Sequence, residues 1–125
     1  YSHALRALPT PENASVMFGS LSGSKLGVWV AHGEGKFDFP YAESEYNVIA
    51  KYTYEGYPAN PNGSMYNVAG VCSKDGRHLA MMPHLERAIF PWQWAYYPED
   101  RKAVDEVTPW LEAFVNARKW IENKK

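Results

Sequence analysis

His84 and Glu86 form the first pair of side chains in this sequence whose types and spacing point to chemistry. They lie in the sequence MMPHLER, residues 81–87, directly after an apolar run that predicts a strand over 78–82. In an extended segment, side chains two residues apart point the same way, so we expect the Glu86 carboxylate to approach one ring nitrogen of His84. That contact would fix the imidazole tautomer and leave the other nitrogen free as a general base. Most His-x-Glu pairs are ordinary surface residues, and it is the position at a strand end that favours catalysis here.

A second candidate is the sequence VAHGEG, residues 30–35, which also follows a β-prone run. Its two glycines could let backbone N–H groups face a ligand, and His32 could add a donor. The simpler interpretation is a tight turn with a solvent-exposed His32, and the pattern by itself favours that interpretation.

Cys72 is the single cysteine, which excludes an internal disulfide and a zinc site made of cysteines alone. It shares a face of its predicted strand with Val68 and Gly70, so we expect a packed small apolar side chain and not a nucleophile. The histidines and their acidic neighbours match no familiar metal-ligand spacing, and we predict no metal site.

The elements that must position these residues are mostly strands. Apolar and β-prone runs predict strands over 28–31, 47–54, 67–73 and 78–82, with a further short strand over 36–39. Asp75-Gly76 between the last two long strands is a strong hairpin signal. Residues 1–26 read as an irregular lead-in.

The end of the chain is predicted to be a helix. Thr108 suits the N-cap, and Pro109 suits the first helical position, where its missing N–H has no intrahelical partner to lose. One wide apolar face follows, expected to pack on the sheet, and it comprises Trp110, Ala113, Phe114, Ala117, Trp120 and Ile121.

Composition narrows the function classes. The 125 residues suffice for one domain, and a net charge of −1 argues against a nucleic-acid binder that works by neutralising phosphates. No run approaches the roughly 20 apolar residues of a membrane span, and no secretory signal is visible, so we expect a cytoplasmic protein without membrane contact. Aromatic residues make up 15% of the chain. The aromatic run at 90–97 is expected to cover a core edge or to meet a partner domain.

Three segments occur in an order that resembles a known family. They are LGVWVAHGEGK at 26–36, YPANPNGS at 57–64 and DGRHLAMMPHLER at 75–87. Together they resemble the C-terminal part of the glutamine amidotransferase domain of the phosphoribosylformylglycinamidine synthase family. The resemblance covers about residues 15–122.

The resemblance implies an α/β fold, the C-terminal portion of a flavodoxin-like class I (triad) glutamine amidotransferase domain, mostly strands followed by a closing helix. In that family a Cys attacks the side-chain amide of glutamine, and a His and a Glu in a Pro-His-Pro-Glu-Arg motif assist it. The motif assigns His84 as general base and acid and Glu86 as the residue that orients it, with Leu85 in place of the second Pro. His32 is implied to line or border the glutamine site.

The family's nucleophile lies in a Gly-x-Cys-Asn-Gly type of segment, which these residues do not contain. The resemblance therefore implies that 1–125 is a partial glutaminase domain, inactive alone, which needs the upstream part of the same enzyme, including its synthetase domain. It implies ammonia supply for the ATP-dependent synthesis of an amidine in purine biosynthesis. ATP and magnesium are expected elsewhere in the parent enzyme, and no cofactor in this segment. The alternative is a non-catalytic binding module that keeps the same sheet.

Overall fold

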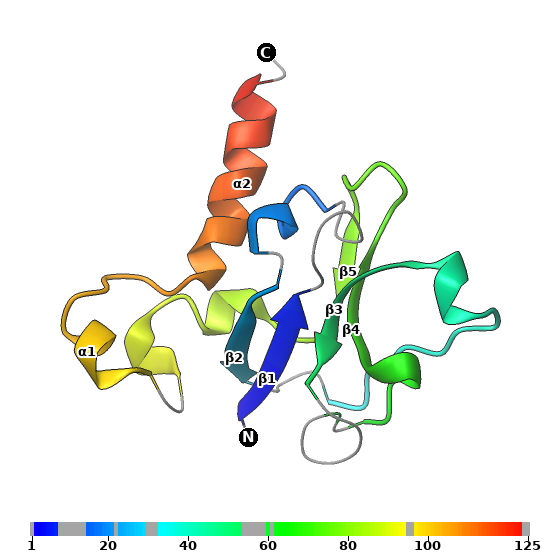
Figure 1. The fold of residues 1–125 in the computed structure, drawn as a ribbon, viewed down its shortest axis with the longest axis horizontal. Coiled ribbons are helices and arrows are strands. Elements are labelled where there is room, and N and C mark those ends of the chain that lie inside the picture. The colour runs from blue at the N-terminus through cyan, green and yellow to red at the C-terminus, as the bar shows by residue number, and fades with distance from the viewer. Residues whose placement is uncertain are drawn as a thin grey trace.

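The fold is a mixed α/β arrangement in which a five-stranded sheet precedes a closing helix (Figure 1). The structure is a computed structural model, and it describes residues 2–7, 15–21, 23–29, 33–53, 60, 62–94 and 97–123. The strands are β1 (Ser2–Ala7), β2 (Lys25–Trp29), β3 (Asn47–Tyr52), β4 (Val68–Cys72) and β5 (Leu79–Met81). The helices are α1 (Glu99–Lys102) and α2 (Trp110–Asn123). The expected α/β class, with strands first and a closing helix last, is confirmed.

The sheet has the order β2-β1-β3-β4-β5, and each described pair of neighbouring strands is antiparallel. The β4–β5 pair is the predicted hairpin. Ser73 donates its N–H to the His78 carbonyl at 2.9 Å, and Gly76 takes a φ of +74°, which a glycine adopts without strain. The strand β3 is buried on both faces and carries the two register shifts of the sheet, which let Ile49 and Ala50 join the same core cluster.

Two predictions of elements were wrong. Residues 1–26 were expected to be irregular, yet β1 lies in the sheet between β2 and β3, because pairing on both edges outweighs its weak local preference for a strand. Residues 36–39 form no strand. Phe37 instead exchanges bonds with the 64–65 segment, accepting from the Met65 N–H at 3.1 Å and donating to the Ser64 hydroxyl at 3.0 Å.

The helix α2 packs chiefly on two short 3₁₀ turns, Gly19–Leu21 and Leu85–Arg87, and only its first half is deeply buried. Trp110 and Ala113 enter the main core, whereas Phe114 and Ile121 stay exposed. Figure 1 shows the second half of α2 extending away from the sheet. The predicted apolar face is therefore only partly covered, since Ala117 and Trp120 are half-buried.

Candidate active site

The candidate site is a single turn that follows β5. The Nδ1 atom of His84 lies 2.9 Å from the Oε1 atom of Glu86, so the two side chains form a hydrogen-bonded pair. His84 has extended backbone angles, and the next three residues, Leu85–Arg87, form a 3₁₀ turn. The contact was predicted, but its expected geometry was wrong. A turn, and not the alternation of an extended strand, brings the imidazole and the carboxylate together.

The core fixes this turn. Leu85 is only 4% exposed and belongs to the main core cluster, and Pro83 and Ala88 on either side are buried as well. The turn is closed by two backbone bonds, Arg87 N–H to the His84 carbonyl at 3.3 Å and Ala88 N–H to the Leu85 carbonyl at 2.9 Å. Leu85 points into the core while the side chains before and after it face outward. It therefore anchors the turn where the resembled motif has a proline.

The contact with Glu86 orients the His84 ring so that its other nitrogen, Nε2, is available for proton transfer. The backbone N–H of Glu86, and after it the His84 ring, hold the pKa of the Glu86 carboxyl below its usual value. An ionised Glu86 accepts a hydrogen bond from Nδ1–H, and in that tautomer Nε2 is the nitrogen with the free lone pair. Among the described residues no group hydrogen-bonds to Nε2, and the His84 side chain is 42% exposed. The ring can therefore reach a group supplied from outside these residues.

The start of α2 is hydrogen-bonded to Ala88, the residue that follows the 3₁₀ turn of the site. Thr108 donates its hydroxyl to the Ala88 carbonyl at 2.6 Å, and it accepts the Trp110 N–H at 3.3 Å as a helix cap. Trp110 donates its indole N–H to the Gly27 carbonyl of β2 at 2.7 Å. The predicted cap at Thr108 is confirmed. Its bond to Ala88 has no signal in the local sequence, since the two residues are 20 positions apart.

The second predicted motif is described only in part, because His32 lies outside the described residues. The loop after it is held by the Asn62 side chain, whose amide donates to the Gly33 carbonyl at 2.6 Å and to the Gly35 carbonyl at 2.9 Å. Gly33 has a φ of +61°, as expected for a glycine in a tight turn. Asn62 belongs to the segment 57–64, so two of the three recognised segments are joined here. The role assigned to His32 stays a prediction.

Cys72 has the predicted character of a core side chain. It is buried in the main cluster, and burial, followed by the charge of Asp75, raises the pKa of its thiol. A thiol with a raised pKa is a poor nucleophile at neutral pH.

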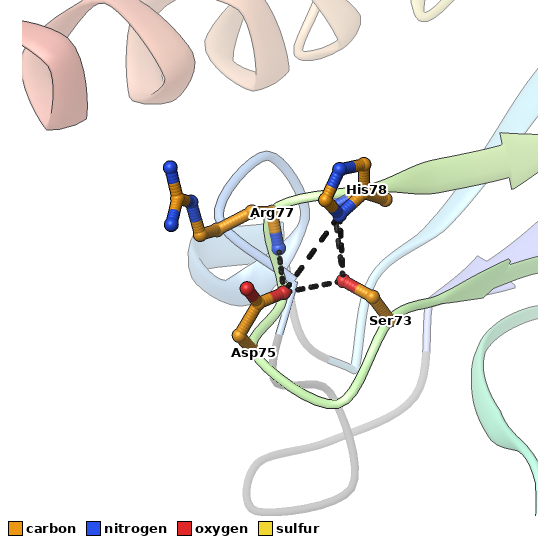
Figure 2. Close-up of polar contacts among 4 residues, drawn as sticks. All are labelled: Ser73, Asp75, Arg77 and His78. Carbon is orange, nitrogen blue, oxygen red and sulfur yellow. Dashed lines mark hydrogen bonds and ion pairs between the residues drawn. The ribbon is translucent and has the colours of Figure 1, made fainter.

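A second group of polar residues closes the hairpin, and Figure 2 shows it: Ser73, Asp75, Arg77 and His78, the hairpin cluster. The Asp75 carboxylate accepts the Ser73 hydroxyl at 2.5 Å and the Arg77 N–H at 3.1 Å. The His78 ring lies 3.4 Å from the Ser73 Oγ and 3.9 Å from Asp75. In a hydrolytic triad the acid is hydrogen-bonded to the histidine, and the histidine is hydrogen-bonded to the serine. Here Asp75 is hydrogen-bonded to Ser73 itself, as acidic side chains often are in turns. The cluster therefore stabilises the hairpin.

The aromatic run after the site serves two purposes. Trp94 donates its indole N–H to the Ala88 carbonyl at 2.8 Å and packs edge-on against the buried Tyr97, so this part covers a core edge, as expected. Phe90 and Trp92 stack on each other at 6.0 Å between ring centroids, and Trp92 is 75% exposed. These two rings form an open aromatic surface beside the site.

Two further classes of feature are absent from the described residues. No three His, Cys, Asp or Glu side chains there gather closely enough to hold a metal ion. Within the same part of the chain, no helix has the length and apolar character needed to cross a membrane.

Comparisons with known proteins agree on one family. Residues 2–121 match the family described as the CobB/CobQ-like glutamine amidotransferase domain. The chain is 43% identical, over 94% of its length, to phosphoribosylformylglycinamidine synthase of Homo sapiens, and 44% identical, over 88%, to the enzyme of that name in Drosophila melanogaster. It spans 9% of the length of each of these relatives.

The fold also has a solved counterpart. A chain in the structure of PurLQS from Thermotoga maritima superposes with a TM-score of 0.64 at 23% identity, covering 97% of this chain and 47% of that one. At this identity the likeness concerns the fold.

Proposed function

The chain belongs to the CobB/CobQ-like glutamine amidotransferase domain family, and on that premise we propose that it forms the C-terminal part of the glutaminase domain of a phosphoribosylformylglycinamidine synthase. Similarity to relatives of that name over about nine-tenths of the chain supports the proposal. The observation that carries the mechanism is the 2.9 Å contact between His84 and Glu86 on a turn anchored in the core.

In the proposed reaction, His84 Nε2 takes the proton of a cysteine thiol supplied from outside these residues. The thiolate attacks the side-chain amide carbon of glutamine, and the amide C–N bond breaks to give a thioester. The same nitrogen hands its proton to the leaving ammonia. In the second half, His84 takes a proton from water, the hydroxide attacks the thioester to release glutamate, and the proton returns to the thiolate. The ionised Glu86 holds the ring in one tautomer and stabilises the imidazolium in both halves.

The ammonia is then used by the synthetase part of the same enzyme, which makes an amidine from formylglycinamide ribonucleotide with ATP. Glutamine is the substrate of the glutaminase domain to which residues 1–125 contribute. ATP and magnesium belong to the synthetase part, outside these residues. Without a nucleophile segment, residues 1–125 alone are expected to leave glutamine intact.

The test is the substitution His84→Ala in the complete enzyme. We expect glutamine-dependent synthesis to fall by about 10³-fold or more, because a triad member is lost, while synthesis from added ammonia stays near the wild-type rate. Rates with both nitrogen donors are measured on the same preparation. An equal loss with both donors contradicts the proposal, and unchanged synthesis from glutamine favours a non-catalytic binding module.

A further inference from the structure

Three hydrogen bonds, two from Thr108 and one from Trp94, converge on the two carbonyls that follow the His84–Glu86 turn. The Ala88 carbonyl accepts both the Thr108 hydroxyl at 2.6 Å and the Trp94 indole N–H at 2.8 Å. The next carbonyl, that of Ile89, accepts the Thr108 N–H at 2.8 Å. Ala88 is fully buried and Thr108 almost so. Water therefore cannot easily replace these bonds, and losing one of the two donors leaves the Ala88 carbonyl held by the other alone.

Ala88 is also the residue that closes the turn, because its N–H bonds to the Leu85 carbonyl at 2.9 Å. The Ala88 N–H thus completes the 3₁₀ turn that carries Glu86, and the Ala88 carbonyl accepts hydrogen bonds from two donors outside the turn. The orientation of the turn relative to the core depends on both sets of bonds. A shift of this segment would move the turn that carries His84 and Glu86 relative to the core.

We propose that Thr108 is a positioning residue for the His84–Glu86 pair, acting through the Ala88 carbonyl together with Trp94. The inference rests on the proposed glutaminase function. Thr108 touches neither His84 nor Glu86 in the described contacts, and its effect passes through the backbone of the turn. Through Trp110 and its bond to Gly27, the same helix start is also tied to β2, so the turn is held against the sheet.

The alternative role for Thr108 is that of a helix cap only, since its hydroxyl oxygen also accepts the Trp110 N–H. The two roles are separable because Trp94 donates to the same carbonyl and takes no part in the cap. Trp94→Phe removes that donor and keeps an aromatic ring against Tyr97. Thr108→Val removes the hydroxyl at nearly constant volume, and Thr108→Ser retains it.

The experiment measures kcat and KM for glutamine, and kcat with ammonia, in the complete enzyme carrying each variant. We expect Thr108→Val to lower kcat with glutamine by about 10- to 100-fold, the effect of a misplaced catalytic group, with KM for glutamine and the ammonia rate unchanged. Trp94→Phe should give a smaller loss in the same parameter, and Thr108→Ser should stay within about threefold of wild type.

Wild-type kcat in both Thr108→Val and Trp94→Phe would overturn the inference, and so would equal losses with glutamine and ammonia. A failure of the proposed function is recognised separately. It appears in His84→Ala as a rate with glutamine that is unaffected, or that falls in step with the ammonia rate.

Discussion

Two histidines in the described part of the chain approach a carboxylate through Nδ1, and the two pairs differ in what holds them, which bears on the catalytic role proposed for His84. His78 lies 3.9 Å from Asp75, its side chain is 83% exposed, and its partners all belong to one hairpin. His84 lies 2.9 Å from Glu86, on a turn whose middle residue, Leu85, is buried in the core. Under the proposed function, contact between a histidine and an acid is therefore not sufficient for catalysis. The pair must also be held by a part of the molecule that does not move with it.

The largest expected effect comes from exchanging the acids of the two pairs for their amides. Glu86→Gln should lower glutamine-dependent synthesis by about 10²- to 10⁴-fold, because the amide no longer holds the ring in the required tautomer. Asp75→Asn, the matched change in the hairpin cluster, should leave that rate near wild type. Steady-state rates with glutamine and with ammonia measure both. Comparable losses in the two variants would remove the distinction between the pairs.

The next effect concerns what holds each pair. Leu85→Ala should lower the free energy of unfolding by about 2–5 kcal/mol and loosen the turn, since it deletes a buried side chain from the core. Arg77→Ala removes from the hairpin cluster a guanidinium that lies 5.1 Å from the Trp120 ring centroid, a contact worth about 0.5–1 kcal/mol when exposed.

Hydrogen exchange followed by mass spectrometry in the complete enzyme measures both effects. Peptides covering residues 83–94 should exchange faster in Leu85→Ala, and those covering 73–82 should change little in Arg77→Ala. Unaltered exchange over 83–94 in Leu85→Ala would show that the core does not hold the turn.

A smaller effect appears in the titration of the two acids. The pKa values of both carboxyls are lowered. For Asp75 the causes are the Ser73 hydroxyl and then the Arg77 N–H, and for Glu86 they are its own N–H and then His84. A folded pKa below the unfolded value, about 4 for such groups, means that the ionised form stabilises the fold above that pH. This stabilisation is lost as the pH falls through the folded pKa.

Carbodiimide reacts with protonated carboxyls, and peptide mass spectrometry reads its products residue by residue. As the pH is lowered, modification of Glu86 and of Asp75 should therefore set in at a lower pH in the folded enzyme than in urea. Identical onset in the two conditions would contradict the lowered pKa values. Since both acids shift in the same direction, titration alone does not distinguish the pairs.

The smallest expected effect is at Cys72, where the prediction is no reaction. Burial raises the pKa of this thiol, so a glutamine-analogue alkylating reagent should leave it unmodified in the folded enzyme at neutral pH and label it only after unfolding. Peptide mass spectrometry identifies the labelled residue. Covalent labelling of Cys72 in the folded enzyme would mean that a Cys72–His84 site, and not an external nucleophile, performs the chemistry.

Much of this arrangement could be predicted from local sequence, and the parts that could not depend on distant partners. Asp75-Gly76 predicted the hairpin and Thr108-Pro109 the helix start, because each signal lies in neighbouring residues. The strand β1 was missed because its identity comes from pairing with β2 and β3.

The candidate site divides in the same way. The contact of His84 with Glu86 was predicted from spacing, but the turn that makes it depends on Leu85 finding the core. The bond from Thr108 to Ala88 joins residues 20 positions apart, and no local pattern carries it.

The most direct test of the central claim is a double-mutant comparison of His84 and Glu86. Glutamine-dependent kcat is measured in the complete enzyme with His84→Ala, with Glu86→Gln and with both substitutions, the ammonia-dependent rate serving as the control for folding. If Glu86 acts through His84, the double variant is no slower than His84→Ala alone, because residues that act as a unit lose their effect together. A double variant slower than His84→Ala by the full factor that Glu86→Gln causes alone would show that the two residues act independently, and would contradict the account.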